Sequence, residues 1–266
     1  MEKLQILLQH DFIANQQATF LQERKLNLQP GEVIVLCDFS ENYSFVLQDA
    51  VQGFHWNNEQ ATIHPFVCYY RPQNLQQFHH LSYVVISDCR THDTIAFHVF
   101  QKHLIALLKN HIGSLEKMYY FSDGAASHYK NKKNFMNVCH HKSDFQVAAE
   151  WHFFATSHGK GPCDGIGGSL KRLAARSSLQ RPYEEQIMTP KDLFDWAEKN
   201  LTSSFFTFVP NEEVERERNF LKHRYNGLRP IPGTRSLHAF IPTSEYSGIM
   251  RLTSFSAEGQ IVTLVP

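Results

Sequence analysis

The stretch Glu32-Val33-Ile34-Val35-Leu36-Cys37-Asp38 is a continuous apolar run that ends in an aspartate. Strands that are buried on both faces of a parallel sheet have this texture, so the run predicts a central strand. A similar run over 118–122 ends at Asp123, and a third, over 151–155, precedes a glycine-rich loop and Asp164. Polar groups beyond the carboxyl ends of such strands gather at one edge of the sheet. We therefore expect the three aspartates to lie together.

Further apolar runs place these strands in a mixed α/β fold. Closely spaced strands, typical of an antiparallel meander, are expected at 43–47, 62–70 and 83–88. Helical spacing of apolar residues predicts helices over 94–112 and 166–179, and a polar helical segment is expected around 128–141. Strands are expected between these helices, at 117–122 and 146–155. The resulting order, βββαβαβα, predicts a ribonuclease H-like mixed sheet flanked by helices.

The chain is expected to divide into three segments. These are an N-terminal helical segment over 1–29, with its clearest apolar pattern at 11–27, a ribonuclease H-like core over 30–205, and a C-terminal segment over 206–266. An amphipathic helix is expected at 193–201, and the last segment is expected to hold a charged helix at 212–225 and strands at 236–241 and 248–252. The C-terminal part is thus predicted to be a small α+β appendage.

The composition fits a folded protein of ordinary size, because 42% of the 266 residues are hydrophobic. Lys and Arg number 26, as do Asp and Glu, so the formal net charge is zero and nucleic-acid binding would need local basic patches. The five cysteines are odd in number and widely spaced, which favours a reducing, intracellular compartment. No apolar run approaches the length of a membrane span, so we expect no membrane partner.

Three carboxylates that converge at one edge of a sheet need a cation between them. Each aspartate taken alone could be a turn or helix-cap residue, and the argument rests on the three together. Hard divalent ions such as Mg²⁺ or Mn²⁺ prefer oxygen ligands. Two such ions would activate a water or a 3′-hydroxyl and stabilise the leaving oxygen of a phosphodiester. The pattern therefore predicts nucleic-acid strand cleavage or transfer at Asp38, Asp123 and Asp164.

Four segments resemble transposase-derived animal proteins with a DDE-type catalytic core. They are 37–43, 53–57, 122–131 and 150–165, within a resemblance that covers roughly residues 30–200. The resemblance implies a ribonuclease H-like catalytic core, dependence on a two-metal Mg²⁺ or Mn²⁺ site, and hydrolysis and strand transfer at transposon ends. It also implies that Asp38, Asp123 and Asp164 are the catalytic and metal-binding residues, that DNA is the partner, and that the protein is nuclear. A homo-oligomer is compatible with this activity.

The third acid departs from the family pattern, because such enzymes most often carry a glutamate there. Glu150 is the competing residue, but it falls inside a predicted strand. Asp164 opens a predicted helix that can direct it back toward the strand ends, so we prefer Asp164 on geometry.

Several basic residues are candidates for contacts with a phosphate backbone. They are Lys130, Lys132, Lys133, His158, Lys160, Lys171, Arg172 and Arg176. His158 and Lys160 lie in the glycine-rich loop, where the backbone can approach a ligand closely. The alternative for the helical residues is an ordinary solvated face, and for the loop a simple strand-to-helix connection.

A structural zinc site is a weaker alternative for other residues. Cys139, His140 and His141, together with His158 and Cys163, offer suitable donors, but their spacing matches no compact zinc motif. Neither a helix-turn-helix nor a zinc finger is visible, so the chain would be a fragment or a domesticated derivative. Two other functions stay open: a catalytically inactive nucleic-acid-binding or scaffolding protein, and a cellular metal-dependent nuclease.

Overall fold

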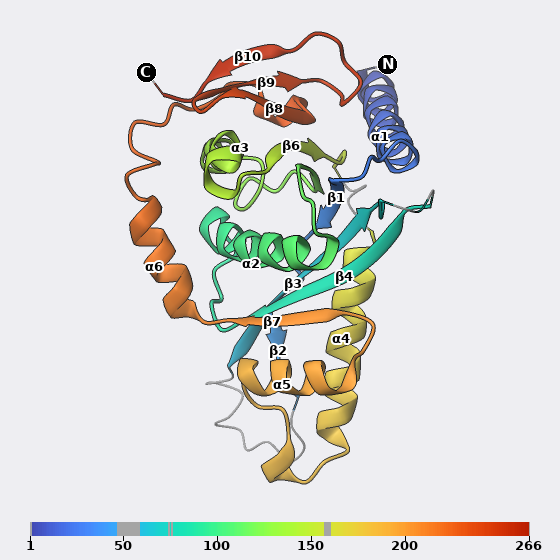
Figure 1. Ribbon diagram of the computed structural model, residues 1–266, viewed down its shortest axis with the longest axis vertical. Coiled ribbons are helices and arrows are strands. Elements are labelled where there is room, and N and C mark those ends of the chain that lie inside the picture. Colours follow the sequence, from blue (N-terminus) through green and yellow to red (C-terminus); the bar gives the residue numbers. More distant parts are fainter. Residues whose placement is uncertain (1, 47–58, 74, 76, 157–160, 266) are drawn as a thin grey trace.

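A computed structural model describes residues 2–46, 59–73, 75, 77–156 and 161–265. Within these residues, ten strands form one mixed sheet with helices on both faces (Figure 1). The path through the sheet is β10-β9-β8-β6-β5-β1-β3-β4-β7, and the short β2 pairs with β3 beside this path. The expected α/β class is therefore confirmed.

The predicted apolar runs occupy the middle of the sheet. β1 (Glu32–Cys37) pairs in parallel with β5 (Lys117–Ser122) and antiparallel with β3 (Gln60–Tyr70). β4 (His79–Ser87) lies antiparallel to β3, and β6 (Ala148–Phe153) lies parallel to β5. β2 (Tyr43–Ser44) is shorter than the strand expected at 43–47, because residues 45 and 46 are not in a strand and residue 47 lies outside the described residues. Since β1 and β5 are buried along nearly their whole length, they have the continuous apolar sequences of central strands.

Both ends of the sheet extend beyond the strands that the sequence predicts. β7 (Phe205–Val209), which was not predicted, joins β4 in parallel. On the other side β8 (Ala239–Ser244), β9 (Ser247–Arg251) and the unpredicted β10 (Gln260–Thr263) continue the sheet from β6. The C-terminal strands that were predicted as an appendage are therefore an extension of the central sheet.

Three helices cover one face. α2 (Thr94–Ile112) and α3 (Lys132–Phe145) pack on this face, where Phe97 and Phe100 of α2 join Tyr120 and Trp151 in one buried cluster. α2 has the predicted bounds, because Asp93 accepts hydrogen bonds from the first-turn backbone N–H groups and Gly113 ends the helix. α6 (Asn211–Leu221) lies against α2, where Lys102 Nζ is 2.7 Å from Glu217 Oε2.

The opposite face is covered by α1 (Glu2–Leu26), α4 (Pro162–Leu179) and α5 (Pro190–Asn200). Phe20 and Leu21 of α1 pack on Leu36 and Phe121, while α4 and α5 cover β3 and β4. On α4, Ala174 is fully buried, whereas Leu173 is 37% exposed. α4 begins at Pro162, earlier than expected, since proline suits the first turn of a helix.

One buried side chain joins the two ends of the described chain. Gln17 of α1 donates from Nε2 to the carbonyl oxygens of Phe153 (2.9 Å) and His238 (3.1 Å). It also donates to Ser254 Oγ, and its Oε1 accepts the N–H of Ser254 at 2.8 Å. Because Gln17 is 1% exposed, these bonds are made away from water. The side chain of Gln17 therefore links the N-terminal helix to β6 and to the residues that flank β8 and β9.

Candidate carboxylate site

Asp38 and Asp123 lie side by side at the carboxyl edge of the sheet. Each follows directly after its strand, and the parallel register of β1 and β5 pairs Leu36 with Phe121, two residues before each aspartate. The expectation that these two acids end adjacent strands is confirmed.

Buried hydrogen bonds fix the backbone at Asp123. Trp151 Nε1 donates to Ser122 Oγ at 2.9 Å, and that hydroxyl donates to the carbonyl oxygen of Asp123 at 2.8 Å. The carboxylate of Asp123 accepts the N–H of Ala125 at 3.1 Å. One oxygen of Asp123 thus shapes the turn after β5, and this is the ordinary turn role that the sequence left open.

The pKa of Asp38 is raised by its surroundings. Burial, and then the negative charges of Asp123 and Asp164, raise the pKa of Asp38 to about 7, while a hydrogen bond from the Phe39 backbone opposes this shift. The negative charges of the two other aspartates therefore disfavour the ionised form of Asp38. The protonated and ionised forms of Asp38 therefore coexist near neutral pH.

Asp164 stands in the first turn of α4, as expected from the sequence. Its Oδ2 accepts the N–H of Gly161 at 2.9 Å, so the carboxylate caps its own helix. Among the described residues, no group of three or more His, Cys, Asp or Glu side chains is arranged to hold a metal ion. The three aspartates share an edge of the sheet, but their carboxylates do not converge on one point.

A glycine brings α4 close to the segment that follows Asp38. A Cβ added at Gly167 would stand 2.1 Å from Ser40 Oγ, so a side chain there would displace Ser40. Lys171, one turn later, donates from Nζ to the carbonyl oxygen of Glu41. These contacts hold the N-terminal half of α4 against residues 38–41 and so position Asp164 near Asp38.

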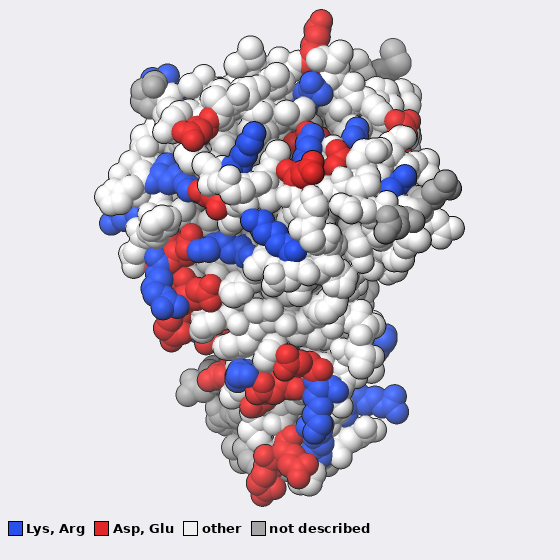
Figure 2. Space-filling view, viewed as in Figure 1, with Lys and Arg blue, Asp and Glu red and all other residues white. Residues whose placement is uncertain are grey.

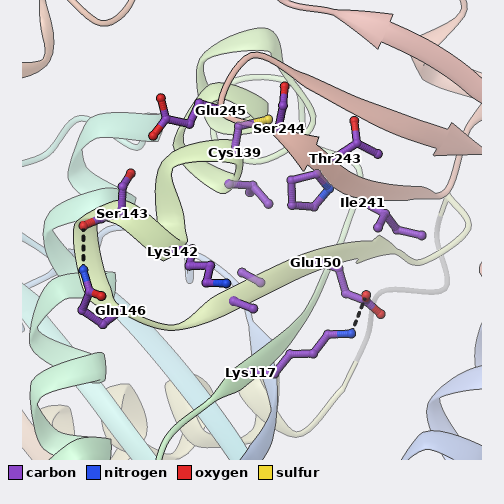
Figure 3. A pocket seen from close by; sticks show the side chains of 14 residues that line it. Lys117, Cys139, Lys142, Ser143, Gln146, Glu150, Ile241, Thr243, Ser244 and Glu245 are labelled. Carbon is purple, nitrogen blue, oxygen red and sulfur yellow. Dashed lines mark hydrogen bonds and ion pairs between the residues drawn. The ribbon is translucent and has the colours of Figure 1, made fainter.

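Glu150 lies elsewhere on the sheet. It pairs in register with Tyr119, which lies four residues before Asp123. Glu150 is therefore displaced from Asp123 by about 13 Å along the strand direction. Burial opposes its ionisation, but hydrogen bonds and charges from His152 (3.1 Å) and Lys117 (3.0 Å) hold the pKa of Glu150 at about 2. Figure 3 shows the pair with Lys117 at the wall of a cavity of about 570 Å³ that also contacts α3 and β8. The geometry argues against Glu150 as the third acid of this site.

Three of the predicted DNA-contacting lysines bind the C-terminal part of the chain instead. Lys130 Nζ donates to the carbonyl oxygen of Arg235 at 3.1 Å, and Lys132 Nζ donates to that of Leu228 at 2.8 Å. The Lys133 Nζ lies 5.5 Å from the ring centroid of Tyr225. Lys130 is buried, and burial lowers its pKa to about 8. These lysines therefore attach residues 225–235 to the body of the protein.

The remaining basic candidates fall into two groups. Arg172 and Arg176 are exposed on α4, beside the bound Lys171. His158 and Lys160, like the motif at 53–57, lie outside the described residues. Among the described residues on the face seen in Figure 2, acidic and basic side chains are interspersed, with no broad area of one sign.

The residues proposed for zinc that the structure describes do not come together. Cys139 donates to the carbonyl oxygen of Ser247, whereas Cys163 donates to that of Leu36. The two thiols belong to hydrophobic clusters on opposite faces of the sheet. His140 and His141 each hydrogen-bond to a backbone carbonyl oxygen through Nδ1. All five cysteines are free and buried, so these side chains have packing roles.

A cluster of histidines around Phe39 was missed by sequence reasoning. The Phe39 ring lies 4.4 Å from the ring of His64, 4.5 Å from that of His92 and 5.0 Å from that of His128, between centroids. Burial, then the charges of His128 and Lys171, lower the pKa of His92 to about 4, so its imidazole is neutral. These rings come from separate segments, so spacing along the chain carries no signal for the cluster.

No helix within the described residues is long and apolar enough to cross a membrane.

Comparison with known proteins matches the chain to a family model. No curated protein and no solved structure matches the chain. A family model described as "Domain of unknown function (DUF8701)" matches residues 17–254, a span that runs from the middle of α1 past β9 and includes all three aspartates. The chain therefore belongs to the DUF8701 family.

Proposed function

We propose that the protein catalyses metal-dependent cleavage and transfer of DNA strands, in the manner of a DDE-type transposase, through Asp38, Asp123 and Asp164. The observation that carries this proposal is the pair of aspartates on adjacent parallel strands, with the pKa of Asp38 raised to about 7 by burial and by the other two acids. Groups with such shifted pKa values are found most often at functional sites.

The order of the central strands supports this proposal. Along the sheet they run β4-β3-β1-β5-β6, with β3 antiparallel to β1 and with β5 and β6 parallel to it. This is the arrangement expected for a ribonuclease H-like sheet built in the order βββαβαβα. In that fold the carboxyl ends of β1 and β5 would carry the first two acids.

The donor set fits a hard divalent cation, because Asp38, Asp123 and Asp164 offer only carboxylate oxygens and repel one another when ionised. Mg²⁺ or Mn²⁺, when bound, would supply Lewis-acid activation of the attacking hydroxyl and charge stabilisation of the leaving oxygen. Asp38 and Asp123 would hold it from the strands. Asp164 would join them after its carboxylate releases the N–H of Gly161. This hydrogen bond is exposed, so breaking it costs about 1 kcal/mol.

Two observations favour a second candidate, a non-catalytic nucleic-acid-binding or scaffolding protein. Asp123 and Asp164 each accept a backbone N–H bond, the normal role of a turn or cap aspartate. A cellular nuclease would use the same three acids but would hydrolyse DNA without joining strands. In either case DNA would be the partner and the nucleus the place of action.

Incubation of labelled duplex DNA with the purified protein and Mn²⁺ tests the three functions. Cleavage that is lost in Asp38→Asn and Asp123→Asn, but kept in the surface control Asp195→Asn, would support an enzyme. Joined products from pre-cut ends would identify strand transfer. Cleavage that persists in a folded Asp38→Asn variant would overturn the assignment, and DNA binding without cleavage would support the non-catalytic candidate.

A further inference from the structure

A cavity of about 300 Å³ adjoins Asp38 on the α1 face of the sheet. Its walls come from α1, from the ends of β1 and β5, and from the first turn of α4, so it lies beside the carboxylate edge. Asp38 is itself one of the lining residues. A molecule bound at Asp38 therefore has direct access to this space.

The cavity has the chemistry of a site for a flat ring with a polar edge. Phe154 and Tyr69, both partly exposed, contribute aromatic surface, and Asp38, another lining residue, has a carboxylate that can accept a hydrogen bond. At the mouth, the Lys25 Nζ lies 3.8 Å from the ring centroid of Tyr69. Ligand sites commonly combine a mostly apolar lining with a few polar groups in this way.

Small side chains on α1 keep the space open. Ala14 and Ala18 lie one helical turn apart and both line the cavity, whereas the neighbouring Phe20 packs into the buried core. Ala18 is exposed, so its methyl group faces the cavity mouth without supporting the core. A larger residue at position 18 would fill the cavity at little cost to folding.

We propose that this cavity receives one unpaired nucleobase of the DNA strand whose phosphodiester lies at Asp38 and Asp123. This inference rests on the proposed function. Aromatic and apolar walls replace the stacking that a base loses when it leaves the duplex, and any of the four bases has a face that can stack. A pocket beside the acids would hold the strand in place next to the reacting phosphate. The substrate class is then DNA with an unpaired or extruded nucleotide at the cleavage site.

Binding of two matched duplexes tests the proposal. One carries a single unpaired 2-aminopurine as a bulge and the other is fully paired, and both are titrated in Ca²⁺ with the full chain. The wild-type protein should bind the bulged duplex about tenfold more tightly, with a change in 2-aminopurine emission on binding. Ala18→Phe should lose this preference, whereas Thr19→Phe, at the adjacent exposed position outside the cavity, should keep it.

The outcomes separate the base pocket from the enzyme. Equal binding of the two duplexes by the wild type, or an unchanged preference in Ala18→Phe, would overturn the base pocket. Loss of cleavage in Asp38→Asn would still support the proposed function in that case. If the wild type binds neither duplex, both proposals fail. Circular dichroism of Ala18→Phe and Thr19→Phe shows that both variants are folded before they are compared.

Discussion

Two partly buried carboxyl groups, one within the sheet and one at its edge, have pKa values shifted in opposite directions. Asp38, at the end of β1, has its pKa raised to about 7, whereas Glu150, within β6, has its pKa lowered to about 2. Burial disfavours the charged form of both. The difference comes from their neighbours, because Asp38 faces two aspartates and Glu150 contacts Lys117 and His152. Glu150 is satisfied by the protein itself, whereas no cationic side chain among the described residues lowers the pKa of Asp38.

The largest expected effect is on catalysis. Asp38→Asn should lower Mn²⁺-dependent DNA cleavage by roughly 100-fold or more, because a ligand oxygen at the reacting phosphate is lost. Glu150→Gln should change the rate by less than about threefold, since Glu150 lies about 13 Å from the level of Asp123 along the strand. Initial rates of cleavage of a labelled duplex make the comparison. Similar losses in the two variants would remove the distinction between the two acids.

The next largest effect is on stability, and here the substitution of Glu150 should have the larger effect. Glu150→Gln should lower the free energy of unfolding by about 2 kcal/mol, because the partly buried Lys117 loses its carboxylate partner and His152 keeps only a neutral one. Asp38→Asn should leave stability at pH 8 unchanged or raise it, since it removes repulsion. Urea unfolding followed by circular dichroism measures both variants. A stabilised Glu150→Gln variant would contradict the assignment of Glu150 as a structural acid.

The two acids also predict different pH dependences. The pKa of Asp38 is raised in the folded state, so its contribution to stability is fully present below pH 4 and is lost as the pH rises toward 7. Glu150 has a lowered pKa, so its contribution is present above about pH 4.5 and is lost as the pH falls toward 2. The wild type should lose stability relative to Asp38→Asn between pH 4 and 7, by about 1 to 2 kcal/mol after allowance for solvent screening.

Urea unfolding at pH 5 and pH 8, with and without Mn²⁺, measures this difference. A bound cation should remove most of it, because the ionised form of Asp38 is then paired. A difference between wild type and Asp38→Asn that is constant over this range would show that Asp38 titrates normally.

The smallest expected effect concerns the third acid. Asp164→Ala should weaken Mn²⁺ binding by about three- to tenfold, because Asp164 must leave its hydrogen bond with Gly161 before it can bind the ion. Glu150→Ala should leave Mn²⁺ affinity unchanged. Isothermal titration with Mn²⁺ compares the two variants directly. If only Glu150→Ala weakens binding, the third ligand has been assigned to the wrong residue.

The central part of the fold could be predicted because burial on both faces leaves a direct signal in the sequence. β1 and β5 are continuous apolar runs, and Asp93 and Gly113 mark the two ends of α2. The outer strands carry a weaker signal. β7 is partly exposed along most of its length, and β10 has only one buried residue, so neither shows a clear pattern. The pairing of β8 with β6 depends on contacts distant in sequence.

For the carboxylate site, the positions of two acids could be predicted, but the partners of the side chains could not. Strand order alone places Asp38 beside Asp123, since both end central parallel strands. Side-chain partners were not predictable, because they depend on tertiary contacts. The capping bond of Asp164 and the attachment of Lys130 to Arg235 are two such contacts. The ion pair of Glu150 is another, although Lys117 was visible in the sequence at the start of a predicted strand.

The buried Gln17 has a consequence for the order of folding. Its partner Ser254 lies 237 residues further along the chain. During synthesis α1 emerges early, yet the hydrogen bonds of Gln17 need groups of β6 and of the segments that flank β8 and β9. Contacts of such long range form slowly, because a large loop must close first. Docking of α1 is therefore a late step, and the wall of the Asp38 cavity that α1 provides is completed only when the C-terminal strands have joined the sheet.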